Sequence, residues 1–365
     1  MRFAGRQTAA VAAVLWLGLA GAGAGTLRVA TWNPELTRPG PGLLLAGLDK
    51  GDDAQIAAVV QVIATARPDV LLLTGLDWDY EGRALAALVA QLAAAGVDYP
   101  HSYAPRPNTG MPTGFDADGN GRLGEPRDAQ GYGRFTGAGG MAILSRYPLG
   151  EPRDFSGLLW RDLPGSLSQD APDLAAVQRL STTAHWDVPV ETPGGPLHLW
   201  AYAATPPVFD GDEDRNGRRN HDETAFWLRY LDGELPSRPA PEPFVILGTP
   251  NLDPVDGEGR RAALHALLSD PRVRDLHPTS PGAAAAPQTG ANAAQQGNPA
   301  EDTARFAAEG SGNAPGNLRS DMILPDARLS VAASGVLWPA APDPIAAVAE
   351  TASRHALVWV DLTLP

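Results

Sequence analysis

The residues whose types and spacing could do chemistry first appear in the acidic stretch DEDRNGRRNHDE at 212–223. Its first, third, fifth, seventh and twelfth positions are Asp212, Asp214, Asn216, Arg218 and Glu223. This is the pattern of a calcium-binding loop, in which alternating side-chain oxygens, the carbonyl of the seventh residue and a closing carboxylate surround Ca²⁺. Pro206 and Pro207 exclude a full helix entering this loop. An alternative interpretation is that Asn220 caps the next helix and Glu223 reaches back to the cap.

A second stretch, DADGNGR at 116–122, repeats the beginning of that pattern. Asp116, Asp118 and Asn120 hold the alternating positions, but the twelfth position is Arg127, and the next carboxylate, Asp128, comes one residue late. The alternative is a solvated glycine-rich turn. Together the two stretches predict structural Ca²⁺ that ties down long connections, and neither would supply catalysis.

Other common chemistries lack their residues. The chain has no cysteine, which excludes thiolate catalysis and thiolate metal sites. It also has no serine-hydrolase elbow, no zinc-protease histidine pair and no lysine-bearing phosphate loop. The formal net charge of −14 argues against a nucleic acid partner, because polyanions repel one another. We expect an unknown small-molecule or protein ligand.

Residues 1–24 have the composition of an export signal. Arg2 and Arg6 precede an apolar run at 9–20, and small residues at 22–24 form a cleavage site. We therefore expect the mature chain to begin near Gly25 in a secreted or periplasmic protein, without stable membrane insertion after cleavage. The alternative is an uncleaved anchor, although the apolar run is shorter than the roughly 20 residues that a spanning helix needs.

The mature chain, residues 25–365, has the pattern of one α/β domain. A strand at 27–32, an amphipathic helix at 53–66 and a buried strand at 69–73 form a β-α-β opening. Further strands are predicted at 140–145, 175–186, 197–202, 243–247, 318–324, 327–337 and 356–364, with helices at 82–95 and 222–231. The segment 280–316 is rich in Ala, Gly, Gln and Asn, which predicts a mobile low-complexity insertion.

Six short segments along the chain form an ordered set of motifs. They are ATWN at 30–33, RPDVLLL at 67–73, GMAILSRYP at 140–148, GTPN at 248–251, LRSDMILP at 318–325 and SRHALVWVDL at 353–362. The chain thereby resembles the endonuclease/exonuclease/phosphatase superfamily. The resemblance implies a four-layer α/β sandwich of two mixed, largely antiparallel sheets flanked by helices. It also implies hydrolysis of phosphate esters with Mg²⁺ or a similar ion held by carboxylates.

Four positions match the superfamily's site residue by residue. Asn33 falls where an Asn lies near the metal, and Asn251 falls where an Asn contacts phosphate. Asp321 matches the Asp of the Arg-x-Asp strand, and His355 matches the His of the terminal Ser-Asp-His motif. The resemblance therefore implies that these four side chains line a polar pocket.

Four other positions depart from the superfamily's site. Gly75 stands where the principal metal-binding Glu is expected, and Ala203 replaces a His. Thr249 replaces the Asp that positions the attacking water and is too weak a base for that role. Arg354 replaces the Asp that is expected to orient the His, and it reverses the charge.

These replacements favour a catalytically impaired protein that acts in binding or as a structural component. The alternative is an active secreted phosphomonoesterase or phosphodiesterase with a displaced site, in which Asp77, Asp79 and Asp321 hold Mg²⁺ or Mn²⁺. A third possibility is a calcium-stabilised extracellular module whose ligand is not a phosphate ester.

Overall fold

The computed structural model describes residues 25–306 and 314–363, and its core is a pair of β-sheets. One sheet contains β1 (Thr26–Trp32), β2 (Val70–Leu76), β3 (His101–Tyr103), β4 (Gly140–Ser145), β12 (Val331–Leu337) and β13 (Leu357–Thr363). The other contains β5 (Arg153–Asp154), β6 (His185–Thr192), β7 (Gly195–Ala203), β8 (Phe244–Thr249) and β11 (Met322–Pro325). A short separate ladder pairs β9 (Ala304–Arg305) with β10 (Asn317–Leu318).

Each large sheet is mixed and largely antiparallel. The six-stranded sheet has the order β12-β13-β1-β2-β4-β3, and the five-stranded sheet has the order β11-β8-β7-β6-β5. The parallel pairs are β1 with β2 and β7 with β8, while all the other pairs in both sheets are antiparallel. Because parallel strands end at the same edge, the last residues of β1 and β2 lie together, as do those of β7 and β8.

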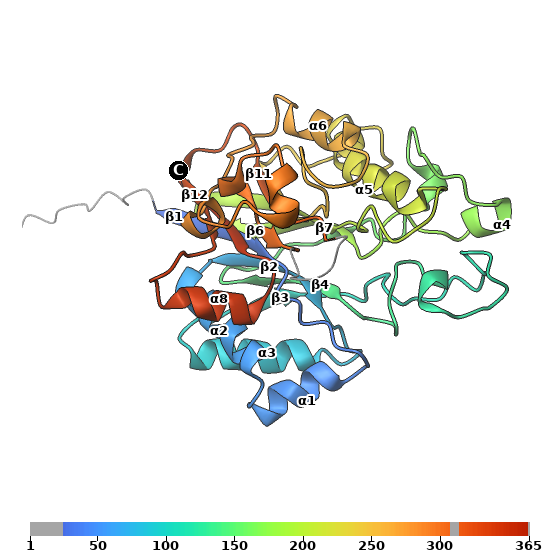
Figure 1. Cartoon of the computed structure of the whole chain (residues 1–365). Coiled ribbons are helices and arrows are strands. Elements are labelled where there is room, and N and C mark those ends of the chain that lie inside the picture. The colour runs from blue at the N-terminus through green and yellow to red at the C-terminus, as the bar shows by residue number, and fades with distance from the viewer. Residues whose placement is uncertain (1–24, 307–313, 364–365) are drawn as a thin grey trace, which may run out of the picture.

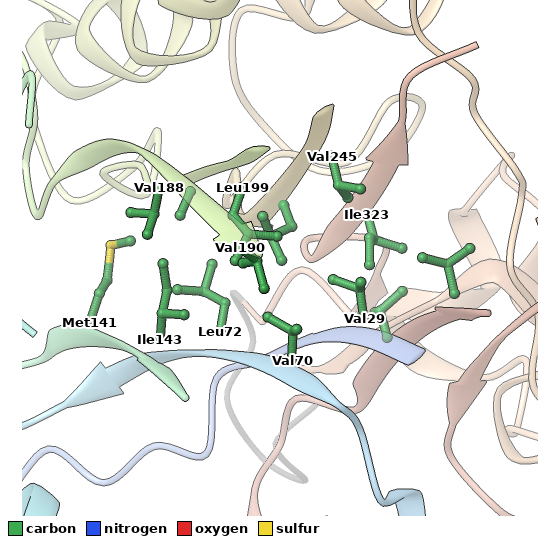
Figure 2. Packing of buried hydrophobic residues seen from close by; sticks show 14 of the residues in the cluster. Val29, Val70, Leu72, Met141, Ile143, Val188, Val190, Leu199, Val245 and Ile323 are labelled. Atoms are coloured by element: carbon green, nitrogen blue, oxygen red, sulfur yellow. The ribbon is translucent and has the colours of Figure 1, made fainter. Parts of the chain in front are cut away.

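Side-chain alternation along the strands packs the two sheets face to face. In β2, Val70 and Leu72 point to the interior between the sheets, whereas Leu71 and Leu73 belong to the cluster on the opposite face. In β8, Val245 takes the interior side. Figure 2 shows these inward rows meeting across the space between the sheets. Successive side chains point to opposite faces, and both faces of the central strands are covered, so these strands are continuous hydrophobic runs in the sequence.

Helices cover the two outer faces. The helices are α1 (Leu43–Lys50), α2 (Ala54–Ala66), α3 (Arg83–Ala94), α4 (Pro172–Ala175), α5 (Arg215–Leu231), α6 (Ala262–Leu268), α7 (Pro281–Ala284) and α8 (Ile345–Ala352). Helices α1, α2, α3 and α8 pack on the six-stranded sheet, and α5 and α6 pack on the five-stranded sheet (Figure 1). Short 3₁₀ turns lie at Pro126–Asp128, Trp160–Asp162, Gly290–Ala294 and Pro299–Glu301. The four layers confirm the predicted α/β sandwich.

The predicted insertion at 280–316 is wrong for most of its length. Residues 307–313 lie outside the described part, but 280–306 are folded onto the core through α7, two 3₁₀ turns and β9. A Cβ on Gly282 would lie 2.2 Å from the Trp338 ring, and the Gly282 amide donates to the Trp338 carbonyl at 2.8 Å. Small residues here permit close packing, so their composition does not indicate a lack of structure.

Two further predictions need correction or lie beyond the described residues. The predicted strand at 175–186 begins only at His185, because α4 and irregular backbone take up the residues before it. The proposed signal at 1–24 lies outside the described residues. Within the described ranges, no helix combines the length and apolar character needed to cross a membrane.

Candidate functional site

The cleft of the molecule lies at the sheet edge where the parallel strands end, and its volume is about 520 Å³. Asn33 follows β1, Thr74 and Gly75 lie just before β2 ends at Leu76, and Ala203 and Thr249 are the last residues of β7 and β8. Ala203 and Thr249 are register partners in the parallel ladder. Thr74 and Thr249 continue the inward rows of their strands, so they meet above the core between the sheets.

A chain of hydrogen bonds runs through the buried floor of this cleft. The hydroxyls of Thr74 and Thr249 are 2.8 Å apart, and Thr249 donates to Asp321 Oδ1 at 2.8 Å. Because a hydroxyl has one proton to donate, Thr74 must be the donor to Thr249. Asp321 Oδ2 accepts from His355 Nδ1 at 2.6 Å and from the hydroxyls of Ser320 and Thr303. Asp321 therefore has donors on both oxygens.

The orienting partner of His355 is Asp321, which corrects the prediction that Arg354 had removed it. Burial favours the neutral imidazole, but the charge and hydrogen bond of Asp321 outweigh it and raise the pKa of His355 above its ordinary value. The indole of Trp32 donates to the His355 carbonyl at 2.9 Å. The histidine is thus fixed at its side chain and its backbone.

Arg354 turns to a different partner. Its guanidinium donates to Glu35 at 2.5 and 2.9 Å, and its side chain is 64% exposed. Burial alone would raise the pKa of Glu35, but the hydrogen bonds from Arg354 lower it below its ordinary value. The positive charge of Arg354 lowers the pKa of His355, but by less than Asp321 raises it. Glu35 is a partner that the sequence did not reveal.

A segment of the supposed insertion closes over His355. Ala304 forms an antiparallel bridge with His355, and the Phe306 ring meets the imidazole edge-on with centroids 5.3 Å apart. Thr303 accepts hydrogen bonds from the amides of Ser320 and Asp321, both at 3.0 Å. The residues around β9 consequently hold the Asp321–His355 pair in a buried setting.

The space above Gly75 is filled by Asn33. A Cβ built on Gly75 would lie 2.2 Å from Asn33 Oδ1, and the φ angle of Gly75 is +61°, which favours glycine. Asn33 Oδ1 also accepts from the Glu35 amide at 3.0 Å, which fixes the side chain there. The position expected for the principal metal ligand therefore lacks a side chain, and a side chain there would require Asn33 to move.

The charge of the cleft suits an anion. None of the described residues that line it carries a carboxylate, although it contains Arg38, Arg134 and seven threonines. Arg38 is paired with Asp53 at 3.1 Å, whereas Arg134 is exposed at the rim and has no ion pair with any described residue. Tyr132, 60% exposed, stands beside Arg134 on the same rim segment.

Close backbone contacts hold that rim segment in place. A Cβ on Gly131 would lie 2.0 Å from the Thr182 carbonyl, and one on Gly133 would lie 2.6 Å from the Gly110 amide. The amide of Gly110 donates to the Gly131 carbonyl at 2.9 Å. The sequence shows the glycines of this segment but not the backbone that they approach. It therefore did not identify Tyr132 and Arg134, which lie between and after these glycines, as site residues.

The displaced metal site predicted from Asp77, Asp79 and Asp321 is not formed. Asp77 accepts from the amides of Arg38 and Gly139 at 2.8 and 3.0 Å, and it joins two loops. Asp79 accepts from two amides at the start of α3 at 2.9 and 2.8 Å. Neither aspartate lines the cleft. The residues present do not fit the divalent ion that the superfamily resemblance implies.

The calcium loop predicted at 212–223 is wrong because α5 begins at Arg215. Helical geometry distributes Asn216, Arg218 and Glu223 along α5 instead of around one ion. Asp214 pairs with Arg260 at 2.5 Å, while Asp212 is exposed in the loop before the helix. The capping alternative is also wrong, because Asn220 lies inside the helix.

The buried polar residues of α5 instead support the cleft wall. Asn220 donates to the carbonyls of Thr205 and Pro250, both at 2.7 Å. Glu223 accepts from the amides of Thr182 and Thr205 at 2.5 and 2.7 Å. Burial raises the pKa of Glu223 to about 7, against lowering by Arg219 and the two amides.

Asn251 closes the same wall. Its side chain donates to the Ala204 carbonyl at 2.7 Å, and its backbone is left-handed with φ at 54°. The structure thus brings Asn33 and Asn251 to the cleft surface, with Asp321 and His355 connected to its floor through Thr249. The four matched residues belong to one region of the molecule.

The stretch at 116–128, called the acidic loop below, has a different outcome from 212–223. Asp116, Asp118 and Asp128 offer carboxylate oxygens within 4.8 Å of one another, the only such group of three in the part of the chain that is described. Asn120 donates to Asp118 at 3.1 Å, and Asp128 accepts from the Ala117 amide at 2.9 Å. The loop's fold brings Asp128 into the group although it comes one position late.

Two packed mixed sheets with helices on both outer faces form a four-layer α/β sandwich, and its polar cleft lies at the ends of the parallel strands. The chain belongs to the endonuclease/exonuclease/phosphatase family, whose model matches residues 45–355. No curated protein matches the chain.

Solved structures show the same fold. An endonuclease/exonuclease/phosphatase from Beutenbergia cavernae is 19% identical with a TM-score of 0.56, over 93% of this chain and 72% of that one. A family protein from Leptotrichia buccalis is 15% identical with a TM-score of 0.50, over 92% and 99%. One from Bacteroides thetaiotaomicron is 14% identical with a TM-score of 0.50, over 94% and 99%. At these identities the likeness concerns the fold alone.

Proposed function

We propose that this chain is a non-catalytic binding protein, which holds an anionic ligand of the phosphate-ester class in its cleft without a divalent metal ion. The observation that carries the proposal is the position of Asn33, whose side chain fills the space above Gly75. The absence of carboxylates among the described cleft residues supports it, because Mg²⁺ and Mn²⁺ are bound through such oxygens. Thr249 also offers no general base.

The donors of the cleft favour an anion. Arg134 supplies a guanidinium that can bind a phosphate through two hydrogen bonds, and threonine hydroxyls line the wall below it. The chain as a whole is strongly acidic, so attraction must come from these local groups. A small ligand fits this distribution better than a nucleic acid, whose many phosphates would meet the remaining negative surface.

Turnover of p-nitrophenyl phosphate and bis(p-nitrophenyl) phosphate tests the loss of catalysis. We expect the hydrolysis rates of the native protein with Mg²⁺, Mn²⁺ or Ca²⁺ to equal those of the His355→Ala variant, after both proteins have been shown to be folded. Metal-dependent hydrolysis that His355→Ala abolishes would overturn the proposal.

Binding of p-nitrophenyl phosphate in a chelating buffer tests the ligand class. Calorimetry should show binding that Arg134→Ala weakens by about tenfold, which corresponds to about 1.4 kcal/mol. Arg238→Ala is the matched control, because Arg238 is exposed and does not line the cleft. Equal affinity in the two variants, or no binding by the native protein, would contradict an anion site at the rim.

We also propose that the acidic loop binds Ca²⁺ as a structural ion. The grouped oxygens of Asp116, Asp118 and Asp128 support this assignment, since Ca²⁺ prefers several carboxylate ligands. Hydrogen bonds, first of all from the Gly121 amide, lower the pKa of Asp116 below its ordinary value and favour its charged form. Thermal unfolding should shift upward with millimolar Ca²⁺ and return with a chelator. If Ca²⁺ causes no such shift in thermal unfolding, the assignment of a calcium site is wrong.

Export is the last part of the proposed function. The basic, apolar and small-residue pattern of residues 1–24 supports it. N-terminal sequencing of protein recovered from the periplasm or the culture medium should begin near Gly25. Recovery only from the cytoplasm with Met1 intact would contradict export.

A further inference from the structure

A second cavity, of about 280 Å³, shares no lining residue with the cleft. It lies between the loop after β8, the end of α6 and the segment that includes the 3₁₀ turn Pro299–Glu301. The carboxylates of Asp253, Asp275, Glu301 and Asp302 line it, against the single guanidinium of Arg319. This acidic cavity therefore carries an excess of negative charge.

Three of the four carboxylates already have protein donors. Asp253 accepts from the amides of Val255 and Asp256 and from the Arg319 amide. Asp275 forms an ion pair with Arg319 at 2.5 Å. Glu301 accepts from His277 at 2.8 Å and from Asn298 at 3.0 Å. These groups are satisfied within the folded chain.

Asp302 is the exception. Its side chain lines the acidic cavity, the residue is only 7% exposed, and its Oδ2 atom is buried without a hydrogen-bond partner. None of the described residues donates to this oxygen. Burial and then the charges of Asp253, Asp256 and Glu301 raise the pKa of Asp302 to about 7. A buried carboxylate without a donor is costly, and a cation supplied from outside would remove that cost.

The arrangement of carboxylates and apolar side chains in the acidic cavity indicates which kind of cation it can bind. Asp302 is not part of a compact group of three ligands, since the acidic loop holds the one such group among the described residues. Pro254, Val255 and Leu268 provide an apolar side to the acidic cavity. A primary alkylammonium combines a compact head bearing three N–H donors with an apolar chain, and so it matches both sides.

We propose that the acidic cavity binds a small primary alkylammonium ion, with its head on Asp302 and its chain against Val255 and Leu268. The site is separate from the cleft and does not depend on the fate of catalysis there. Asp302 contributes the unsatisfied charge, and Asp253 and Glu301 add to the negative potential around it.

Calorimetry with n-butylamine, and with 1-butanol as its neutral counterpart, tests this proposal on the whole protein. We expect butylammonium to bind at least about tenfold more tightly than butanol, and Asp302→Asn to reduce that affinity by at least about tenfold. Asp173→Asn, an exposed position on α4, should leave it unchanged. The proposal is overturned if the native protein shows no saturable binding, if Asp302→Asn binds as the native protein does, or if Ca²⁺ displaces butylammonium stoichiometrically.

Stability against pH gives a second readout without ligand. The folded pKa of about 7 for Asp302 lies above the ordinary value of 3.8, so ionisation opposes folding and stability falls as pH rises between these values. Asp302→Asn should remove that part of the fall, while butylammonium affinity of the native protein should increase as pH rises through about 7. His277, Asp275, Arg319, Asp253, Asp256 and Glu301 also face this region, so the difference between native protein and variant is the quantity to measure. Identical pH profiles would overturn the proposal.

Discussion

The cleft floor and the acidic loop use their carboxylates differently. In the floor, Asp321 is paired with His355 and also accepts from the Thr249 hydroxyl. In the acidic loop, Asp116, Asp118 and Asp128 offer carboxylate oxygens within 4.8 Å of one another, and none of the three forms an ion pair with a cationic side chain in the described part of the chain. The comparison teaches that a carboxylate becomes available to an external cation only where the protein supplies no counter-charge of its own.

Removing the floor's carboxylate should have the largest effect. Asp321→Ala leaves His355 and Thr249 without their acceptor, and breaking a buried pair in this way costs about 3–5 kcal/mol. Urea unfolding measures the loss. Asp118→Ala in the acidic loop should cost within about 0.5 kcal/mol when calcium is absent, because that residue is exposed. Similar losses in both variants would erase the contrast between the two regions.

A carboxylate introduced at position 75 should destabilise the floor without creating a metal site. Gly75→Glu combines an unfavourable φ of +61° with a Cβ placed 2.2 Å from Asn33 Oδ1, and together these should cost about 3 kcal/mol. Gly51→Glu has a similar φ of +71° and open space around it, so it isolates the backbone term. Equal unfolding free energies for the two variants would mean that the Asn33 side chain moves aside at little cost in free energy.

Calcium should distinguish the acidic loop from the stretch at 212–223. At a concentration of 100 times its dissociation constant, a single site stabilises the fold by about 2.7 kcal/mol. Asp116→Asn should lose most of that stabilisation, whereas Asp214→Asn should retain it, because Asp214 pairs with Arg260 just before α5. Thermal unfolding with and without Ca²⁺ provides the measurement. Loss of the calcium effect in Asp214→Asn alone would reverse our assignment.

The smallest expected effect is the pH dependence of the floor's ion pair. The pKa of His355 is raised in the folded state, so the pair's contribution is present below the unfolded pKa and disappears as pH rises through the folded value. The difference in unfolding free energy between native protein and His355→Gln should therefore be larger in mildly acidic than in alkaline solution. A difference that does not vary with pH would show that Asp321 interacts with a neutral imidazole.

Much of the fold follows from local sequence patterns. The helix predicted at 53–66 is α2, and Asp53 caps it by accepting from the amides of Gln55 and Ile56, as its residue type and position indicate. The strand at 140–145 is β4 without change. These elements are periodic and end in recognisable residues, so few long-range contacts are needed to predict them.

The site was less predictable because its key relations are long-range. The partnership of Asp321 with His355 depends on how β11 and the segment before β13 approach each other, which no local pattern encodes. The polar start of α5 imitates a loop because Asn220 and Glu223 are buried by groups supplied from other segments. The Ala- and Gly-rich sequence after residue 280 resembles that of an unfolded segment for the same reason, because the surface on which it packs is provided by a distant residue, Trp338.

The contact between Asn33 and Gly75 also governs how this protein can evolve. A lineage that first acquires a side chain at 75 passes through a less stable protein, and one that first loses Asn33 gives up its contact with the Glu35 amide. The two positions are therefore coupled, because a side chain at 75 is accommodated only when the Asn33 amide turns away from it. A return to metal binding would thus need a new carboxylate at 75 together with a different position of the Asn33 side chain, which is a change of conformation as well as of sequence.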